Sequence, residues 1–463
     1  MAEATTGGIR VPVSLVQEQM WSLQRWAPEP GFYNETLQHR LAFAADPATV
    51  ADALGVLVRR HESLRTSFPT FDGRPNQSIA PTADVDLEVS DLRHLSYEAR
   101  AVELRRIRDD DARRPFDTHS GPVFRTRLFL LDRDSSELCL VLDHLVADAT
   151  AGAILESELD AVLAARAGGG EPAFGHGEID YADFAVWQRR WMTDERLGEH
   201  ERYWVELLRG MAPVRPMPYL GVGIDPLAVE ASELTSPPVR YDFTVPAEVV
   251  TALRRRTRSS PFVLVAAAVV AVVARSTADP DAVLVTSVSG RDRAELDPVV
   301  GLFGSHMVLR LVLDGDPTFE VVVRRARAAM LGLLEHQQVP VSRVVGAVRA
   351  SGTVLAPLAI PVAVHFFHAA RHRWAPGTSL VARPPVREGP AVTEAQDASK
   401  PLEFRFYDDG SSLWGSLLHH PDKYDGRLAA TVVEDVKSVL AAGAADPLVR
   451  LSRLPVSSAA VPA

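Results

Sequence analysis

Cysteine is almost missing from the chain. Cys139 is the only one among 463 residues, so no disulfide can form within the chain. It lies inside the apolar run at residues 138–142, and a thiol in apolar surroundings is usually buried and unreactive. We therefore expect Cys139 to be a structural core residue and not a nucleophile.

Long apolar runs are missing as well. The longest extends from Phe262 to Ala274 and is shorter than the roughly 18 residues that a membrane span needs. Ser260 and Pro261 directly before it are typical of a helix start, so the run predicts a core helix. No cationic, signal-like segment follows Met1, and we therefore expect a cytoplasmic protein with no membrane partner.

The chain also lacks an excess of basic residues. Its formal net charge is −11, which argues against a nucleic-acid partner because phosphates require a basic surface. Basic clusters occur only locally, at residues 105–108, 113–114 and 254–258. Each is interpreted as a solvated helix face, with docking of an acidic partner as the alternative.

Motifs for several common chemistries are absent. There is no glycine loop for nucleotide phosphates and no Gly-x-Ser-x-Gly nucleophile elbow. His365 with His368, and His419 with His420, have spacings that could suit a metal, but no third ligand cluster accompanies either pair. We interpret these histidines as core or loop residues and predict no metal site.

Residues 143–149, Asp-His-Leu-Val-Ala-Asp-Ala, are the first feature that suggests acid–base chemistry. They follow the apolar run directly, and their three titratable side chains must pair or face a cleft because an unpaired buried charge costs several kcal/mol. Histidine has an ordinary pKa of about 6.5, which suits proton transfer near neutral pH, so His144 is the candidate base. Alone, the heptad is weak evidence, because an isolated His between two Asp is more often part of a surface turn.

Strand and helix patterns alternate along the chain and predict an α/β fold. Period-two or continuous apolar patterns predict strands at residues 123–131, 137–142 and 282–288. Helical spacing of apolar residues occurs at 49–60, 96–112, 151–165, 247–256, 318–334 and 426–442. Glycine density at 167–179 suggests a domain boundary, residues 210–238 and 375–400 are loop-like, and residues 452–463 predict a frayed tail.

Several segments, in the right order over residues 10–440, resemble the condensation domains of nonribosomal peptide synthetases. Residues 60–68 match the signature Arg-His-Glu-x-Leu-Arg-Thr-x-Phe in full, and residues 13–21 are similar to the opening Ser-x-x-Gln-x-x-Met/Leu-Trp segment. Further similar segments lie at 114–117, 121–125, 181–188, 290–291, 300–303 and 336–340.

The resemblance implies two lobes like chloramphenicol acetyltransferase, arranged as a pseudo-dimeric V with a central tunnel. The lobes would be residues 1–173 and 174–463. The resemblance further implies that a donor acyl group enters on the phosphopantetheine arm of an acyl or peptidyl carrier protein. A small-molecule or carrier-bound acceptor would enter from the opposite face, and the protein itself would bind no cofactor.

The family heptad is His-His-x-x-x-Asp-Gly, and this chain departs from it. Asp143 replaces the first His and Ala149 the Gly, while His144 matches the second His, which the family uses as a catalytic or positioning group. By the same resemblance Asp148 is expected to form a structural ion pair with Arg291. Asp143 is interpreted as a tolerated substitution at a structural position.

A second departure follows residues 300–303. Ser305 and His306 stand where the family has Asn-Thr, which makes them candidates for lining the acceptor channel. A plain structural turn is the alternative.

Three functions stay open. The first is a free-standing condensation enzyme that forms an amide or ester bond from a carrier-tethered acyl thioester and an amine or hydroxyl acceptor. The second is a catalytically silent module that binds carrier proteins and recruits partners. The third is heterocyclization, whose motif Asp-x-x-x-x-Asp-x-x-Ser is met by Asp143 and Asp148 but has Ala151 in place of the Ser.

Overall fold

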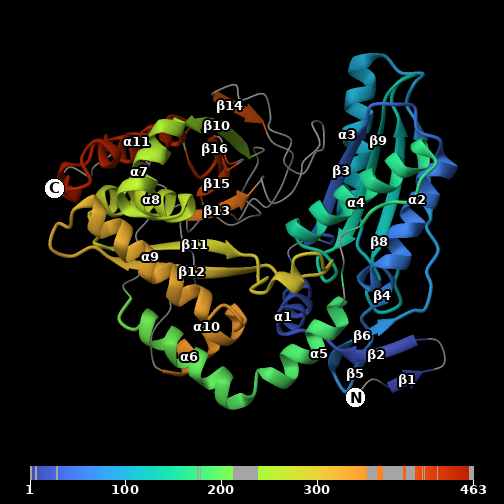
Figure 1. Ribbon diagram of the computed structural model, residues 1–463, viewed down its shortest axis with the longest axis horizontal. Coiled ribbons are helices and arrows are strands. Elements are labelled where there is room, and N and C mark those ends of the chain that lie inside the picture. Colours follow the sequence, from blue (N-terminus) through green and yellow to red (C-terminus); the bar gives the residue numbers. More distant parts are fainter. Residues whose placement is uncertain are drawn as a thin grey trace. The chain divides into compact units, whose positions relative to one another are not determined.

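The computed structural model describes residues 3–5, 8–27, 30–174, 177, 179–211, 238–351, 362–368, 389–392, 402–408, 410, 412–424 and 426–457. Contacts divide the chain into two compact units (Figure 1). The first contains Met1–Leu197 and Ser289–Gly304, and the second contains Gly198–Val288 and most of the residues after Gly304. Both units combine helices and strands, as predicted. The lobe boundary expected at residues 173 and 174 stays a prediction.

The first unit is built on a four-stranded sheet with the order β3-β9-β8-β7. Its strands are β3 (Asn34–Leu41), β7 (Leu87–Asp91), β8 (Phe124–Leu130) and β9 (Ser136–Asp143). A second sheet has five short strands, which are β1 (Glu3–Thr5), β2 (Gly8–Pro12), β4 (Thr66–Ser67), β5 (Thr70–Phe71) and β6 (Arg74–Ile79). The helices are α1 (Leu15–Gln24), α2 (Pro47–Arg60), α3 (Tyr97–Arg113), α4 (Ala149–Gly168) and α5 (Tyr181–Trp191).

Strand β9, which leads into the heptad, is buried on both faces. Leu138, Leu140 and Leu142 belong to the core that contains apolar residues of α2 and α4. Cys139 and Val141 point to the opposite face, where apolar residues of α3 cover them. Burial raises the pKa of the Cys139 thiol to about 12, so the sulfur is uncharged at neutral pH and the expected structural role is confirmed.

A buried ion cluster ties β3 to α4. The side chain of His39 is 1% exposed, and its ring nitrogens lie 3.3 Å from Glu156 and 2.9 Å from Asp160. Burial lowers the pKa of His39, but hydrogen bonds and charges from Asp160 and Glu156 outweigh it and raise the pKa to about 9. The cluster therefore fixes β3, the strand paired with β9, against the helix that follows the heptad.

The second unit has a seven-stranded sheet with the order β12-β11-β13-β15-β16-β10-β14. Its strands are β10 (Val239–Val245), β11 (Asp281–Val288), β12 (Ser305–Val312), β13 (Val362–His368), β14 (Gly389–Val392), β15 (Leu402–Asp408) and β16 (Leu413–His419). The remaining helices are α6 (Asp194–Leu208), α7 (Ala247–Thr257), α8 (Pro261–Thr277), α9 (Phe319–Glu335), α10 (Val341–Ala350) and α11 (Gly426–Ala445).

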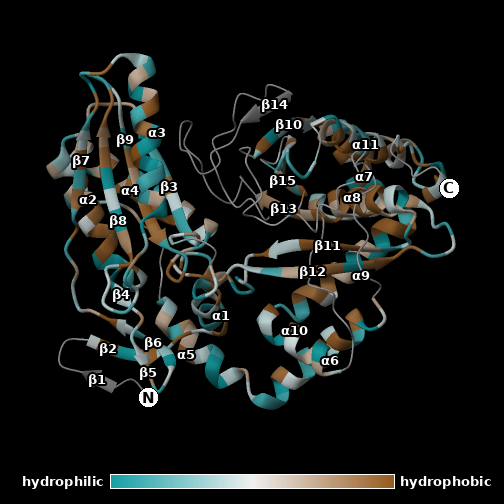
Figure 2. Cartoon of the chain, turned by 180° about the vertical axis from the view of Figure 1, so that it is seen from behind, coloured by the Kyte–Doolittle hydropathy of each residue, from teal (hydrophilic) through white to brown (hydrophobic). Residues whose placement is uncertain are grey.

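Helix α8 is the core helix predicted from the longest apolar run. Ser260 caps its first turn and Pro261 is its first residue. The helix contacts α7, α9, α11 and β11, and Figure 2 colours it hydrophobic along most of its length. Within the described residues, no single helix is long and apolar enough to cross a membrane; only α7 and α8 together pass on length and composition, and they are bent by 98°.

The predicted helices and strands are confirmed within a few residues at their ends, but the frayed tail is wrong at its start. Leu454 and Val456 are buried, and the amide of Ser457 donates to Asp435 at 2.8 Å. Apolar side chains and a polar anchor therefore hold residues 452–457. Within the loop expected at residues 375–400, the structure describes only strand β14. The other residues of that loop lie outside the described residues, as do residues 212–237 of the loop expected at 210–238.

Replacing His39 tests the ion cluster. Because the folded-state pKa of His39 is raised from 6.5 to about 9, its stabilisation is complete below pH 6.5 and is lost as the pH rises to about 9. The free energy of unfolding of the unaltered protein should fall by on the order of 2–3 kcal/mol over this range. In His39→Gln that fall should be absent, whereas His94→Gln, at an exposed histidine, should keep it. Denaturant titrations at several pH values provide the measurement.

Candidate active site

The heptad forms a loop that is fixed by backbone hydrogen bonds to both neighbouring strands. The amide of Asp143 donates to the carbonyl of Val123, before β8, at 2.9 Å. The amide of His144 donates to the carbonyl of Tyr33, before β3, at 3.1 Å, and the amide of Val146 donates back to Asp143 at 3.0 Å. The loop position therefore depends on the sheet and not on the heptad side chains alone.

The imidazole of His144 is oriented by a backbone carbonyl. Its Nδ1 lies 2.6 Å from the carbonyl oxygen of Ala147, which can only accept a hydrogen bond, so Nδ1 carries the proton. In the neutral ring Nε2 is then unprotonated and can accept a proton from another molecule. The side chain is 19% exposed, and Nε2 lies 3.6 Å from the carboxylate of Glu35 in β3. No motif indicated Glu35 as part of the site.

Asp143 is buried, and its carboxylate is hydrogen-bonded to the protein. Its Oδ1 accepts hydrogen bonds from the Gln24 side chain at 2.7 Å and from the Leu145 amide at 2.9 Å. Burial raises the pKa of this carboxyl, while those two hydrogen bonds oppose the shift. The contacts favour the structural interpretation, in which Asp143 joins the end of α1 to the loop.

Asp148 makes the predicted ion pair with Arg291. Its two oxygens lie 2.9 and 3.2 Å from the guanidinium nitrogens. The same carboxylate caps α4 by accepting from the Ala151 amide at 2.8 Å, and it accepts from the amides of Phe303 and Gly304 at 3.0 and 2.9 Å. Burial alone raises the pKa of Asp148, but the Arg291 charge and these hydrogen bonds outweigh it and lower the pKa.

Residues 290–303 are shaped to bring Arg291 to this carboxylate. The guanidinium stacks over the Phe303 ring at 4.3 Å, and its side chain is 2% exposed. Gly290 has φ +65, and a Cβ there would lie 2.2 Å from the Phe303 carbonyl oxygen. A Cβ on Gly301 would lie 1.9 Å from the Tyr181 ring. The two motif glycines are therefore required by close contacts.

The opening motif holds the loop from another side. Gln17 donates through Nε2 to the Leu145 carbonyl at 2.9 Å, and it completes a capping box with Ser14 at the start of α1. The Ser14 hydroxyl contacts the Tyr181 hydroxyl at 2.8 Å, and Tyr181 donates to the Leu302 carbonyl. Motif segments that lie far apart in the sequence therefore meet around residues 143–148.

The other candidate residues have different positions. Ala149 is the exposed first residue of α4, while Ala151 is fully buried. Ser305 and His306 begin β12 in the second unit, where His306 is exposed and the Ser305 hydroxyl has no hydrogen-bond partner among the described residues. Their place in an acceptor channel, like the tunnel itself, stays a prediction.

The histidines considered for metal binding are mostly core residues. His365 is buried, with Nδ1 2.5 Å from the Ser287 hydroxyl and Nε2 3.7 Å from Glu403, and His419 and His420 are also buried. The His368 side chain lies outside the described residues. Across the ranges that the structure describes, no three His, Cys, Asp or Glu side chains are grouped to hold a metal.

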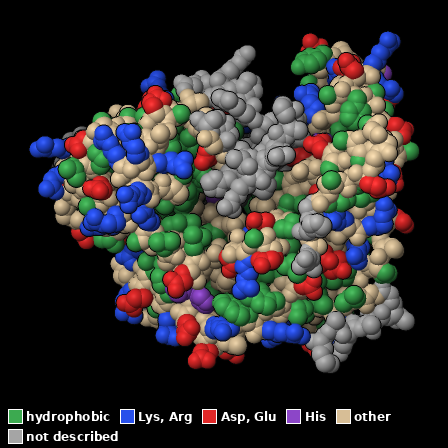
Figure 3. All heavy atoms as spheres, in the orientation of Figure 1, with side chains coloured by type: hydrophobic (Ala, Val, Ile, Leu, Met, Phe, Trp, Pro, Cys, Tyr) green, Lys and Arg blue, Asp and Glu red, His purple; other side chains and the backbone are tan. Residues whose placement is uncertain are grey.

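Of the basic clusters, the one on α7 is the least neutralised. Arg254, Arg255 and Arg258 are exposed and make no ion pair with any described residue. In Figure 3, basic side chains gather over α7 and its neighbours at the left. The cluster is therefore a local positive surface on an acidic protein.

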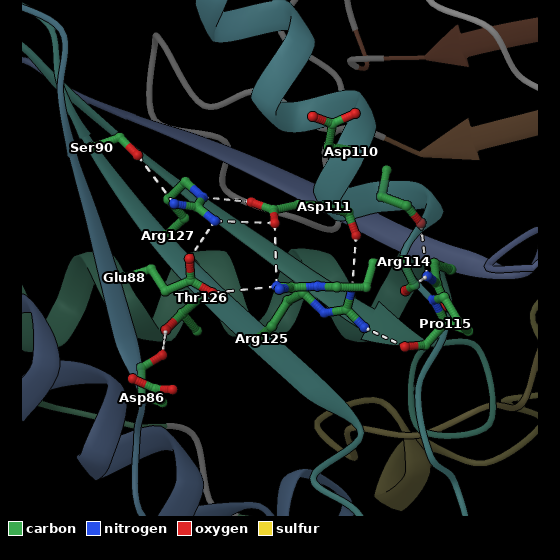
Figure 4. A network of polar contacts seen from close by, with 12 residues as sticks. Asp86, Glu88, Ser90, Asp110, Asp111, Arg114, Pro115, Arg125, Thr126 and Arg127 are labelled. Carbon is green, nitrogen blue, oxygen red and sulfur yellow. Dashed lines mark hydrogen bonds and ion pairs between the residues drawn. The ribbon is translucent and has the colours of Figure 1, made fainter.

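The clusters on α3 are instead largely paired with acidic residues. Arg106 pairs with Glu103 and Asp110 at 2.6 and 2.7 Å, and Arg108 pairs with Glu137. Figure 4 shows the network beside them. The Asp111 carboxylate accepts a hydrogen bond from the Arg127 Nε at 2.6 Å, and the Asp111 backbone carbonyl accepts one from Arg125 at 2.9 Å. Arg114 donates to Glu88 in the same network. Arg108, Arg125 and Arg127 therefore hold α3 on the sheet, whereas the ion pairs of Arg106 lie within α3.

Replacing Arg291 tests the ion pair. Arg291→Ala would leave the Asp148 carboxylate buried without its counter-ion, which costs about 3–5 kcal/mol. A substantial drop in melting temperature and in the yield of folded protein is expected. Arg293→Ala is the matched control, since that exposed arginine stacks over Trp187 at 4.3 Å and forms no ion pair with a described residue. Equal melting temperatures for the two variants would count against a stabilising role of the pair.

Comparison with known proteins identifies the family. The family model described as "Condensation domain" matches residues 9–458. Phosphinothricin tripeptide synthetase PhsC of Streptomyces viridochromogenes is 35% identical over 347 residues, which are 74% of this chain and 31% of that protein. A linear gramicidin synthase of Brevibacillus parabrevis is 32% identical over 341 residues, 72% of this chain and 6% of that protein. The chain thus spans less than a third of these relatives.

Solved structures share the fold. The X-domain from teicoplanin biosynthesis superposes with a TM-score of 0.75 at 23% identity and covers 98% of this chain and 99% of that one. The first condensation domain of the calcium-dependent antibiotic synthetase, with a substrate analogue, has a TM-score of 0.70 at 21% identity over 96% and 99% of the two chains. The chain therefore belongs to the condensation domain family of nonribosomal peptide synthetases and has its chloramphenicol acetyltransferase-like α/β fold.

Proposed function

We propose that this chain joins a carrier-tethered acyl thioester to an amine or hydroxyl acceptor, with His144 as base or positioning group. Condensation is the reaction of the family, and the assignment to His144 depends on one observation. Its Nδ1 proton is held by the Ala147 carbonyl at 2.6 Å, so the unprotonated Nε2 is on a partly exposed edge of the ring. This is the form of histidine that general base catalysis requires.

The chemical work required of His144 is moderate. The acceptor nitrogen or oxygen bonds to the thioester carbonyl carbon, the carbon–sulfur bond breaks, and His144 passes the acceptor proton to the leaving thiolate. Base catalysis contributes roughly a hundredfold to ten-thousandfold. Holding the two reactants together is worth about 7–11 kcal/mol and is the larger contribution.

The proposed partners are one or more acyl or peptidyl carrier proteins, which present the donor, and in some cases the acceptor, on phosphopantetheine. The protein would need no resident cofactor, because the thioester is already activated. The exposed arginines 254, 255 and 258 support contact with an acidic partner. The proposal is the same for a separate protein acting in the cytoplasm and for one domain of a longer synthetase.

Heterocyclization is disfavoured by the contacts of the two aspartates. Asp148 is occupied by Arg291 and three backbone amides, and Asp143 by Gln24 and the Leu145 amide. Ala151, at the position of the motif serine, is buried and has no hydroxyl. Both carboxylates are therefore engaged in holding the loop, which argues against a role on a substrate.

A recruitment module is the second candidate, favoured by the variant heptad and by the X-domain similarity. One X-domain of similar fold, with a TM-score of 0.75, was solved in complex with OxyB from teicoplanin biosynthesis. If this chain worked in the same way, it would bind carrier proteins and a partner enzyme without acyl transfer. Retention of His144, with its Nδ1 held by the Ala147 carbonyl, favours the enzyme.

His144→Ala tests the enzyme against the recruitment module. Product formation from a loaded donor carrier and candidate acceptors should fall at least a hundredfold, because the base is removed while the backbone contacts of the loop remain. Intact mass spectrometry of the carrier protein measures it. His94→Ala, at an exposed histidine, is the control. Undiminished turnover would leave His144 without a catalytic role, and no turnover in the unaltered protein would favour recruitment.

Asp143→Asn separates condensation from heterocyclization. The amide keeps an oxygen that accepts from Gln24 and Leu145, so condensation should stay within about fivefold of the unaltered rate if Asp143 is structural. Under heterocyclization, Asp143→Asn should abolish product, because a carboxylate is required. The same mass measurement distinguishes these outcomes, since a cyclized product is lighter by one water.

A further inference from the structure

Glu35 is the charged residue nearest the reactive nitrogen of His144. Strand β3 places its side chain on the sheet face that also carries Leu37 and His39, and Glu35 is paired in register with Leu142 of β9. The Tyr33 carbonyl and the His39 ion cluster fix the strand on both sides of this position. Glu35 is therefore held beside the loop by the same backbone that holds His144.

The contact between Glu35 and His144 lacks a donor. The Glu35 Oε1 lies 3.6 Å from Nε2, beyond hydrogen-bond distance, and Nε2 of the neutral ring is an acceptor like the carboxylate. No arginine or lysine among the described residues forms an ion pair with Glu35. The two side chains are 40% and 19% exposed, so a ligand can reach both.

The Glu35 carboxylate and Nε2 of His144 together suit a ligand that carries several hydrogen-bond donors and a positive charge. An ammonium group has three N–H donors, so it can donate to the Glu35 carboxylate and to Nε2 at the same time while it neutralises the carboxylate. A hydroxyl has a single donor and can satisfy only one of the two. Charge and donor count both favour a cationic amine.

We propose that Glu35 and Nε2 of His144 form a subsite for the ammonium form of the acceptor, which selects amines over alcohols and makes the chain an amide-forming enzyme. This inference rests on the proposed function and names its acceptor class. Glu35 acts as a specificity-determining residue that places the amine against the base.

The proton balance follows from this placement. The bound ammonium carries three protons, and the amide product keeps one. The first proton passes to Nε2 and on to solvent, which frees the nitrogen lone pair to attack the thioester carbonyl carbon. As the carbon–nitrogen bond forms and the carbon–sulfur bond breaks, a second proton passes through Nε2 to the thiolate sulfur.

The expected kinetic effect is on binding. A carboxylate attracts the bound ammonium, and the acceptor nitrogen becomes positively charged again as it bonds to the carbonyl carbon, so the carboxylate stabilises the bound acceptor and the transition state about equally. Removing its charge should raise KM for the amine and leave kcat nearly unchanged. Since both side chains are partly exposed, the effect should be about tenfold, equivalent to 1.4 kcal/mol.

A binding experiment tests the subsite without relying on turnover. The probes are alanyl-pantetheine and lactyl-pantetheine, each joined through an amide in place of the thioester, so they differ only in ammonium against hydroxyl. In Glu35→Gln, Kd for the alanyl probe should rise about tenfold and Kd for the lactyl probe should stay the same. Glu35→Asp should keep most of the preference, and Glu98→Gln, with the same charge change at an exposed site on α3, should have no effect.

Turnover with the corresponding thioesters separates the two proposals. Amide formation by the unaltered protein that is lost in His144→Ala, together with an increase in KM in Glu35→Gln for amines only, supports both. An equal effect on amine and hydroxyl acceptors, or none, overturns the role of Glu35 and leaves the proposed function standing. If the protein shows no turnover but its binding of the alanyl probe still depends on Glu35, the subsite is supported and the proposed acyl transfer is contradicted.

Discussion

The ion pair between Asp148 and Arg291 is the interaction on which the site depends. Residues 289–304 are distant in sequence from the heptad but belong to the same compact unit, and this pair joins them to the start of α4. One carboxylate receives a guanidinium and three backbone amides, so the helix start, the loop before it and the segment around Phe303 have a common anchor. Such a buried pair fixes geometry, and loss of the guanidinium leaves a buried carboxylate without its counter-ion.

Beside this ion pair, hydrogen bonds from several other segments of the first unit hold the loop at residues 143–148. Gln17 binds its middle, Gln24 binds Asp143, and the strands on either side bind its backbone. Buried polar groups need partners, so each motif residue here satisfies another. The motifs of the family describe, in this chain, a network that holds one histidine in one orientation.

Much of this could be predicted from the sequence because motif residues have fixed spacing and the strands and helices have clear periods. Seven helices (α2, α3, α4, α7, α8, α9 and α11), the strand before the heptad and the core position of Cys139 were predicted from the residues, and the pair of Asp148 with Arg291 was expected from the family resemblance. Glu35 was not, since a single glutamate in a short strand carries no periodic or motif signal, and its meaning depends on a neighbour 109 positions away. The tail was mispredicted because Leu454 and Val456 are too few to produce a pattern, although both are buried.

The carbonyl of Ala147 that orients the imidazole has a consequence for how the heptad can vary. A side chain that orients an imidazole can be lost through a single substitution. A backbone carbonyl oxygen is present whichever amino acid occupies the position. Drift at positions 143 and 149 can therefore proceed without altering which ring nitrogen bears hydrogen. A substitution at position 143 or 149 therefore does not by itself indicate that the imidazole has lost its orientation, which depends on the backbone conformation at Ala147.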